Sequence, residues 1–326
     1  MDMDIDGIVG TVRNFPGITR KHPIQEVVGY LPTADFSNVL ASAGEDAAVI
    51  KNGDECILFA ADGIMESLMK TNPYYAGYFA VLVNVNDIAA MGGMPLAMVD
   101  IVSIKDNRIC TQVLKGMERA VRKFKVPIVG GHTHPDCAYN AIDVSIIGTA
   151  PCDEVIYSHT ARVGDDIVFV MDLDGFYPPE LPLAWDTTTV KDDELVRRQI
   201  LVMRQIGKEK LATAAKDMSN PGALGTLGML LETSGKGARV DLAKVPRPNE
   251  VDFTQWLISY QGCGFAITCS PSSSARILEL FSEVGMDGAV VGGIEKGRKF
   301  VVHHGSEERI LFDFETDKIT GCIRKG

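Results

Sequence analysis

The sequence lacks the features that place a protein in or across a membrane. No apolar stretch in its 326 residues reaches the ~18 to 20 residues that a membrane-spanning helix requires. The N-terminal segment MDMDIDGIVG is acidic and has neither the basic region nor the apolar run of a signal peptide. These absences predict a cytoplasmic protein with no membrane partner.

Paired cysteine motifs and an excess of positive charge are also missing. The seven cysteines are odd in number, widely spaced and without a CxxC pair, so we expect them to be reduced. The formal net charge is −11, so no general electrostatic field favours a polyanion such as DNA or RNA. We therefore expect no nucleic-acid partner.

What the sequence does contain is the composition of a folded protein. Hydrophobic residues make up 46% of the chain and charged residues 23%, which argues against extensive disorder. The length suits two domains of ordinary size, at ~100 to 200 residues each. We divide the chain into an N-terminal arm (1–40), a first domain (41–155) and a second domain (156–326).

Hydrophobic periodicity and turn residues predict an α/β (α+β) fold. The segment Asn52-Gly53-Asp54 is a strong signal for a hairpin between two antiparallel strands. In the arm and the first domain we expect helices at 24–31, 76–91 and 111–124, and strands at 47–50, 56–61, 96–104, 127–129 and 142–149. In the second domain we expect helices at 192–206, 222–233 and 275–284, and strands at 167–171, 257–269 and 289–293.

Four acidic motifs lie at or near the ends of these predicted elements, where a scaffold can direct side chains at a ligand. Asp87 lies inside an otherwise apolar helix, so its carboxylate needs a partner. Hard oxygen ligands suit Mg²⁺, although any one of these aspartates could be a simple cap or turn residue. The motifs are Gly44-Glu45-Asp46-Ala47, Ala61-Asp62-Gly63, Asn84-Val85-Asn86-Asp87 and Lys216-Asp217-Met218-Ser219.

Two longer runs resemble a known enzyme superfamily. The run Asn72-Pro73-Tyr74-Tyr75-Ala76-Gly77 and the later run 85–95 (VNDIAAMGGMP) strongly resemble the aminoimidazole ribonucleotide synthetase (PurM-like) superfamily. Its members include thiamine monophosphate kinase, selenophosphate synthetase and the hydrogenase maturation enzyme that makes a cyanide ligand. The matches continue in order over most of the chain, and the whole sequence is most similar to the archaeal methanogenesis marker protein 2 group.

The resemblance implies a PurM-like fold of two α/β domains. It also implies a homodimer in which N-terminal strands of both subunits close a β-barrel, with ATP at the side of this barrel. The implied magnesium ligands are Asp46, Asp62, Asp87 and Asp217, with Glu45 as a further candidate. Nucleotide contacts are expected from Asn84 and from a glycine turn whose backbone amides can approach a phosphate, Gly130, Gly131, His132 and Thr133.

Three positions depart from the patterns of individual members. Ile18 occupies the place of the reactive Cys or selenocysteine of selenophosphate synthetase, although Lys21 is kept. Asn220 replaces an acid of thiamine monophosphate kinase, and Cys322 is not the last residue, as the cysteine of the cyanide-forming enzyme is. Lys21 could stabilise charge on the phosphates during transfer, or it could be a solvated lysine beside Arg20.

These observations predict a magnesium-dependent enzyme that transfers a phosphoryl group from ATP to a small molecule or a protein-bound group. The resemblance suggests a role in methanogen cofactor or enzyme maturation. The alternative is a nucleotide-binding accessory protein, in which ATP controls assembly without substrate turnover. The loop 174–190 is either a substrate or partner surface or a plain surface loop.

A rival hypothesis comes from the histidines next to the glycine pair. His132 and His134, with Asp136 nearby, could bind zinc or iron as part of a hydrolase. Catalytic sites of that type usually need a third protein ligand, and the remaining histidines occur in no recognisable spacing. His303 and His304 fit a polar strand end near the C-terminus.

Overall fold

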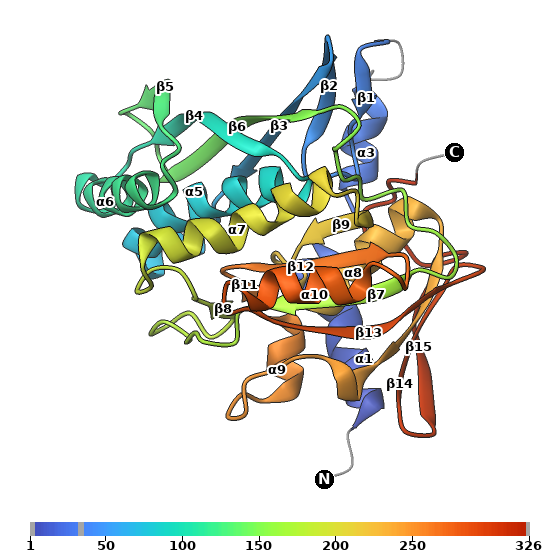
Figure 1. Cartoon of the computed structure of the whole chain (residues 1–326). Coiled ribbons are helices and arrows are strands. Elements are labelled where there is room, and N and C mark those ends of the chain that lie inside the picture. The colour runs from blue at the N-terminus through green and yellow to red at the C-terminus, as the bar shows by residue number, and fades with distance from the viewer. Residues whose placement is uncertain (1–3, 32–35, 324–326) are drawn as a thin grey trace.

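Two mixed sheets organise the chain in a computed structural model that describes residues 4–31 and 36–323 (Figure 1). The first sheet has the strand order β1-β2-β3-β6-β4-β5, and every pair is antiparallel except β4 with β5. Its strands are β1 (Val39–Ala41), β2 (Ala48–Asn52), β3 (Glu55–Gly63), β4 (Met94–Ser103), β5 (Ile128–His134) and β6 (Ala141–Pro151).

The hairpin predicted at Asn52-Gly53-Asp54 is confirmed. Strands β2 and β3 pair antiparallel up to Asn52 and Glu55. Gly53 has a φ of +68°, in the left-handed region that a tight hairpin turn needs. The local sequence therefore specifies this corner of the sheet.

Helices α4 (Glu66–Thr71), α5 (Pro73–Ala90) and α6 (Asn107–Phe124) accompany the first sheet, and α5 packs against β3 and β6. Helix α5 begins at Pro73, three residues before the predicted start, because the Asn72 side chain accepts a hydrogen bond from the Tyr75 amide at 3.3 Å and Pro73 occupies the first turn. Gly77 and Gly116 let the backbones of α5 and α6 approach closely. The opposite face of the sheet has exposed apolar side chains, among them Phe59 and Ile101.

The second sheet is covered on both faces. Strand β7 is buried along almost its whole length, with Val168 and Val170 in one hydrophobic core and Ile167 and Phe169 in the other. Burial on both faces explains why this strand is a continuous apolar run rather than an alternating one. The order is β15-β14-β10-β13-β7-β12-β9, from β7 (Asp166–Met171), β9 (Ala212–Asp217), β10 (Gly237–Asp241), β12 (Gly264–Cys269), β13 (Asp287–Glu295), β14 (Lys299–His304) and β15 (Glu307–Asp313).

The remaining elements surround this second sheet. Figure 1 shows α7 beside α5, between the two sheets, and α10 against the second sheet. Strands β8 (Ala184–Trp185) and β11 (Tyr260–Gln261) form a separate two-stranded sheet. The helices are α7 (Asp193–Lys208), α8 (Gly222–Ser234), α9 (Phe253–Ile258) and α10 (Ser274–Ser282), with a 3₁₀ turn at Leu242–Lys244.

The N-terminal arm is more regular than its sequence suggested. Besides α3 (Ile24–Tyr30), near the predicted helix, it forms α1 (Ile5–Asn14) and α2 (Pro16–Thr19). Buried side chains of α1 and α2 join the core of the second domain, where α1 contacts β15 and α9. Arg13 also reaches Asp317 at 2.9 Å. The arm is thus tied to the far end of the chain, an arrangement that short-range patterns could not reveal.

Two predictions of local structure are wrong. The expected strand at 257–269 is divided into α9, β11 and β12, because the Asp252 side chain caps a helix by accepting a hydrogen bond from the Gln255 amide at 2.8 Å. The predicted turn at 130–133 is part of strand β5, which extends well beyond the expected 127–129. Strands β9, β10, β14 and β15 were not predicted as strands, although the expected polar strand end at His303 and His304 is confirmed in β14.

The cysteines are not all reduced, contrary to our expectation. A disulfide joins Cys56 at the start of β3 to Cys152 just after β6. These strands are antiparallel neighbours with Cys56 opposite Ala150, so their pairing brings two distant cysteines together. In the described part of the chain, no helix is both long and apolar enough to cross a bilayer.

Candidate functional site

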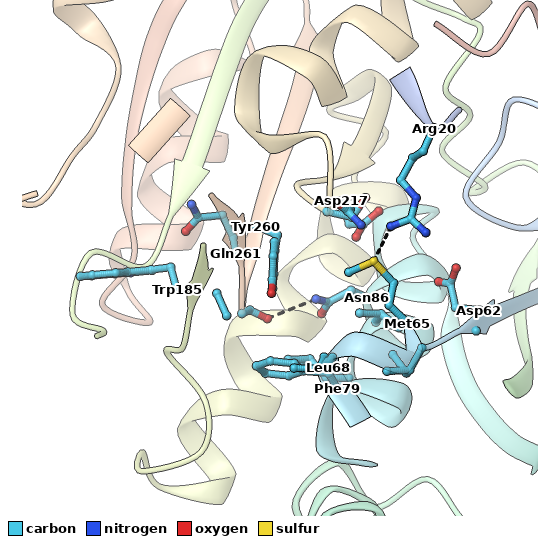
Figure 2. Close-up of a pocket in the computed structure, with 18 of the residues that line it drawn as sticks. Arg20, Asp62, Met65, Leu68, Phe79, Asn86, Trp185, Asp217, Tyr260 and Gln261 are labelled. Carbon is cyan, nitrogen blue, oxygen red and sulfur yellow. Dashed lines mark hydrogen bonds between the residues drawn. The ribbon is translucent and has the colours of Figure 1, made fainter. Parts of the chain in front are cut away.

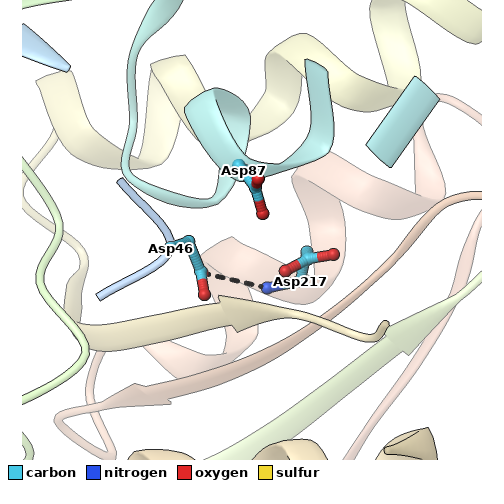
Figure 3. Close-up of side chains that lie close together, drawn as sticks. All are labelled: Asp46, Asp87 and Asp217. Carbon is cyan, nitrogen blue, oxygen red and sulfur yellow. Dashed lines mark hydrogen bonds between the residues drawn. The ribbon is translucent and has the colours of Figure 1, made fainter. Parts of the chain in front are cut away.

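Three of the predicted aspartates meet between the domains. Asp46 lies in the turn between β1 and β2, Asp87 in the last turns of α5, and Asp217 at the end of β9 (Figure 3). One carboxylate oxygen from each residue lies within 4.8 Å of those of the other two. Helix α5 and strand β9 are in contact, and the turn before β2 completes the group. Elements far apart in the sequence thus form one cluster of carboxylate oxygens, which we call the aspartate trio.

The trio is electrostatically strained when it holds no cation. Burial, followed by the neighbouring carboxylates Asp62, Asp217 and Asp46, raises the pKa of Asp87 well above its usual value. Burial and the neighbouring Asp46 likewise raise the pKa of Asp217 well above its usual value, against the opposing effect of Lys216. Buried like charges favour either a proton or a cation between them. The arrangement is therefore chemically suited to a divalent metal ion.

Lys216 supplies the nearest positive charge. Its Nζ donates a hydrogen bond to Asp46 Oδ1, and the Asp217 amide donates to Asp46 Oδ2 at 3.3 Å. Burial opposes the charge of Lys216, but Asp46 and the other nearby carboxylates outweigh it and raise the lysine pKa. The sequence motif contained this lysine directly before Asp217, yet we assigned it no role.

Glu45 lies next to Asp46 but is not a member of the trio, and its carboxylate contacts two other partners. Its Oε2 accepts a hydrogen bond from the Ser158 amide at 2.6 Å, and its Oε1 lies 2.5 Å from His159 Nδ1. Burial raises the pKa of Glu45, but the contacts with His159 and Ser158 outweigh burial and lower the pKa overall. Glu45 thus ties the turn that contains Asp46 to the segment entering the second domain. Its predicted role as a metal ligand stays a prediction.

Two neighbouring cavities meet at the trio. The smaller, ≈ 220 Å³, contains the three aspartates together with Lys216 and Cys322. The larger, ≈ 260 Å³, extends away between α5 and the second domain (Figure 2). The side chains that line both cavities are Lys21, Asp62, Asp217 and Ser219. Asp62, at the end of β3, therefore lies where the cavities join.

The arm contributes two cations to this region. Arg20 lines the larger cavity and Lys21 lines both. Among the described residues, no carboxylate lies within ion-pair distance of either side chain. Their position is set by α2, because the Lys21 amide donates to the Ile18 carbonyl at 2.9 Å and Ile18 is buried. Lys21 therefore lies beside the aspartate trio, and its role in stabilising phosphate charge stays a prediction.

The segment 184–188 of the loop 174–190 is buried, whereas residues such as Asp174 and Val190 are exposed. Asp186 is 0% exposed and accepts a hydrogen bond from the Tyr75 hydroxyl of α5 at 3.1 Å. Trp185 lines the larger cavity, and its Nε1 donates to the Asp172 carbonyl at 2.9 Å. This segment therefore fastens the domains together and forms part of a cavity wall.

Other predicted residues lie away from the trio. Gly130, Gly131, His132 and Thr133 are exposed on β5, at the edge of the first sheet, and line neither cavity. Asn84 is buried in α5, where its Nδ2 donates to the Ala80 carbonyl at 2.8 Å. Their nucleotide contacts stay predictions.

The rival histidine site gains no support from the geometry. His132 and His134 lie on the same face of β5, with ring centroids 4.5 Å apart. Within residues 4–31 and 36–323, the aspartate trio is the group of three His, Cys, Asp or Glu side chains close enough to share a metal ion, and it includes neither histidine nor Asp136.

Several wall residues escaped the sequence interpretation. The larger cavity is lined by Phe79 of α5, Tyr260 and Gln261 of β11, and Trp185 of β8. These residues have no shared motif, and β8 and β11 are only two residues long. A signal in the sequence was available for two cavity residues. Trp185 belongs to the loop 174–190, for which a substrate or partner surface is one of the two interpretations, and Cys322 is the residue compared with the terminal cysteine of the cyanide-forming enzyme. Cys322 reaches the smaller cavity from the C-terminal segment.

Comparison with protein families identifies both halves of the chain. The family model for the N-terminal domain of AIR synthase related protein matches residues 44–150, and the model for the C-terminal domain matches residues 173–305. An uncharacterized protein of Methanocaldococcus jannaschii is 46% identical over 98% of this chain and 100% of its own length. An uncharacterized protein of Synechocystis is 36% identical over 85% of this chain and 86% of its own length.

Relatives with named activities are more distant. The selenide, water dikinase of Carboxydothermus hydrogenoformans is 27% identical over 68% of this chain and 66% of that protein. PurL of T. maritima, solved in complex with ATP, matches with a TM-score of 0.71 at 22% identity, over 84% of this chain and 47% of PurL. AaThiL, solved with AMPPCP and TMP, matches with a TM-score of 0.67 at 20% identity, over 87% of this chain and 94% of AaThiL. The chain spans about half the length of the PurL structure. The similarities to PurL and AaThiL establish a shared fold.

Proposed function

Because the chain belongs to the AIR synthase-related family, we propose that it is a magnesium-dependent enzyme that transfers a phosphoryl group from ATP to a small molecule or a protein-bound group. The observation that supports this proposal is the aspartate trio, whose three carboxylates lie within 4.8 Å of one another. Magnesium prefers such oxygen ligands and usually shares them with phosphate oxygens. Related proteins solved with ATP and with AMPPCP make a nucleotide the natural ligand to test.

In this proposal Asp46, Asp87 and Asp217 hold the metal. Asp62, which lines both cavities, is a further metal ligand. A bound magnesium ion neutralises phosphate charge in an acidic protein and orients the triphosphate. Lys21 then stabilises the charge that develops on the transferred group, and the buried walls exclude water from it. Each of these roles is electrostatic, as phosphoryl transfer requires.

The proposal is tested by calorimetric titration of ATP into the protein with and without Mg²⁺. We expect magnesium-dependent binding that Asp87→Asn weakens by at least about tenfold, which is ~1.4 kcal/mol. Asp136→Asn is the matched control, because that carboxylate lies outside the trio. Equal binding by the Asp87→Asn variant and the wild-type protein would overturn the assignment of the metal site.

We further propose a homodimer through the open face of the first sheet. Four exposed apolar side chains support it, since Phe59 lies opposite Ile147 on neighbouring strands and Val99 and Ile101 continue the same face on β4. Exposed apolar patches of this kind mark interaction surfaces. Light scattering should give the mass of a dimer for the wild-type chain and that of a monomer for Phe59→Glu.

The dimer also bears on the predicted nucleotide contacts at 130–133. These residues line neither cavity of their own chain, so in this proposal they act on a site completed by a second copy.

The finer assignment to methanogen cofactor or enzyme maturation rests on the resemblance of the sequence to the methanogenesis marker protein 2 group. Normal growth and normal enzyme maturation in a methanogen lacking the gene would contradict this role.

A further inference from the structure

The last turn of helix α8 contains a buried carboxylate that holds a segment near the C-terminus. Glu232 is 1% exposed. Its Oε1 accepts hydrogen bonds from the Ile319 and Gly321 amides at 2.9 and 3.1 Å. Its Oε2 accepts from the Thr320 amide at 2.8 Å and from the Thr320 hydroxyl at 2.7 Å. An ionised carboxylate is a pure acceptor with about four lone-pair sites, so these donors match it fully. Glu232 therefore fixes the segment 319–321 in one position.

The segment fixed by Glu232 forms part of the wall of the smaller cavity. Thr320 and Cys322 line this cavity together with the aspartate trio. Cys322 also packs against the turn that contains Asp46, because a Cβ added at Gly44 would lie 3.2 Å from Cys322 Cβ. The C-terminal segment is thus in direct contact with the turn between β1 and β2.

The next two residues of α8 support the same turn. A Cβ added at Gly44 would lie 3.0 Å from Thr233 Cγ2. Ser234 Oγ donates a hydrogen bond to the Ser158 carbonyl at 2.9 Å, and the Ser158 amide donates to Glu45 Oε2 at 2.6 Å. Three consecutive side chains at the end of α8 therefore support this turn, one by direct contact and two through the segments that they hold.

The turn needs this support more than the other two elements of the trio do. Asp87 lies in a helix and Asp217 in a strand, whereas Asp46 lies in the irregular turn between two strands. Mg²⁺ requires nearly octahedral geometry with oxygens at about 2.0–2.1 Å, whereas Ca²⁺ accepts about six to eight oxygens in flexible arrangements. A displaced Asp46 would therefore weaken the binding of Mg²⁺ more than that of Ca²⁺.

We propose that Glu232 is a positioning residue for the magnesium site: by fixing the segment 319–321 behind the turn, it keeps Asp46 in place opposite Asp87 and Asp217. Glu232 lines neither cavity, so it acts through this segment and not by contact with metal or nucleotide. The role in magnesium binding rests on the proposed function, whereas the support of the turn does not.

Calorimetric titration of AMPPCP, in Mg²⁺ and separately in Ca²⁺, tests this role with Glu232→Gln. The variant has nearly the same shape, but its amide nitrogen cannot accept the hydrogen bonds that one carboxylate oxygen accepts. We expect binding to weaken at least about tenfold in Mg²⁺ and less than about threefold in Ca²⁺. Equal losses in the two metals would indicate a general loss of structure and would overturn the proposal, as would unchanged binding in Mg²⁺.

Asp165→Asn is the matched control. Asp165 is 6% exposed and accepts hydrogen bonds from the Arg162 amide at 2.8 Å and the Thr213 hydroxyl at 2.6 Å, but it lines neither cavity. This variant should lose stability without changing the ratio of the affinities in the two metals. Thr320→Val removes one donor to Glu232 at similar volume and serves if Glu232→Gln does not fold. It should shift the ratio in the same direction, by at least about threefold, and an unchanged ratio would overturn the proposal.

Hydrogen exchange without metal or nucleotide keeps the two proposals distinguishable. The Glu45 amide donates to the Ser42 carbonyl at 3.1 Å, so its exchange reports on the opening of the turn. Glu232→Gln should speed exchange in peptides that cover 42–47 and 319–323 and leave β7 unchanged. Wild-type protein that does not bind AMPPCP in Mg²⁺ would contradict the proposed function. Unchanged exchange of the turn in Glu232→Gln would contradict the positioning role, whatever the titrations give.

Discussion

Lys216 and Asp46 form an ion pair at the centre of the site, with side chains only 5% and 6% exposed. Lys216 is the residue before Asp217 in strand β9, so the same strand fixes the position of both side chains. It offsets part of the repulsion among the three carboxylates without lying among the metal-ligand candidates itself. The site can therefore remain folded in the absence of a cation, at reduced stability.

Replacing Lys216 with Met should expose this repulsion. Removal of one partner from a buried ion pair costs about 3–5 kcal/mol, so the unfolding free energy in EDTA should fall by that amount. Urea denaturation measures the loss, and saturating Mg²⁺ should recover part of it. Lys216→Met combined with Asp46→Asn should be less destabilised than Lys216→Met alone, and additive effects of the two changes would contradict the coupling.

The metal-free protein should be more stable in mild acid than in mild base. The pKa values of Asp87 and Asp217 are raised above the usual 3.8 by burial and neighbouring carboxylates. A raised carboxyl pKa means that the native state binds the proton more tightly, so this stability is full below the unfolded pKa and is lost as pH rises through the folded pKa.

Thermal denaturation at about pH 5 and about pH 8, in EDTA and in Mg²⁺, measures this effect. The difference between the two pH values should shrink in Mg²⁺ and in the Asp87→Asn variant. An Asp87→Asn protein with an unchanged pH difference would show that this carboxyl does not titrate as expected.

Gly116 should not tolerate even a methyl group. A Cβ there would lie 2.0 Å from the Tyr74 carbonyl oxygen, across the contact between α5 and α6. Gly116→Ala should therefore lower the unfolding free energy by at least about 2 kcal/mol. Gly10→Ala is the matched control, because a Cβ at Gly10 meets nothing within 4 Å, and it should stabilise helix α1 by about 0.5–1 kcal/mol.

The disulfide between Cys56 and Cys152 should contribute measurably to stability. The two cysteines are 96 residues apart, and closing a long loop typically contributes about 2–4 kcal/mol. Reductant should therefore lower the unfolding free energy of the wild-type chain and leave a Cys56→Ser, Cys152→Ser variant unaffected. Thiol titration of the denatured, unreduced protein should count the five free cysteines, and seven would contradict the pairing.

A substitution of Lys21 should distinguish an ATP-using enzyme from a nucleotide-binding accessory protein. Lys21→Met should keep ATP affinity within a few fold but reduce magnesium-dependent ADP formation by roughly a hundredfold or more, as loss of a charge-stabilising donor does. Lys51→Met, at an exposed lysine of β2, is the control. ATP binding without ADP formation by the wild-type protein, under conditions that include candidate acceptors, would favour the accessory role.

The sequence predicted the local elements that depend on neighbouring residues. The glycine of the β2–β3 turn and the apolar run of β7 each specify an element through interactions within a few positions. The sequence analysis predicted only one helix in the arm, because the other two helices, α1 and α2, are stabilised by packing against the second domain. The turn predicted at 130–133 became a strand because β4 offered a pairing edge, which the sequence of that segment does not encode.

The sequence alone determined which side chains are available to the site, since the aspartates and their motifs can be recognised without coordinates. Only the tertiary structure decided which of them meet. Asp46, Asp87 and Asp217 are brought together by contacts between elements more than forty positions apart. The same packing directs Glu45 to His159 and places Lys216 against Asp46. The conformational preferences of residues act between near neighbours in the sequence. The meeting of these charged side chains depends instead on how the helices and sheets pack around the two hydrophobic cores.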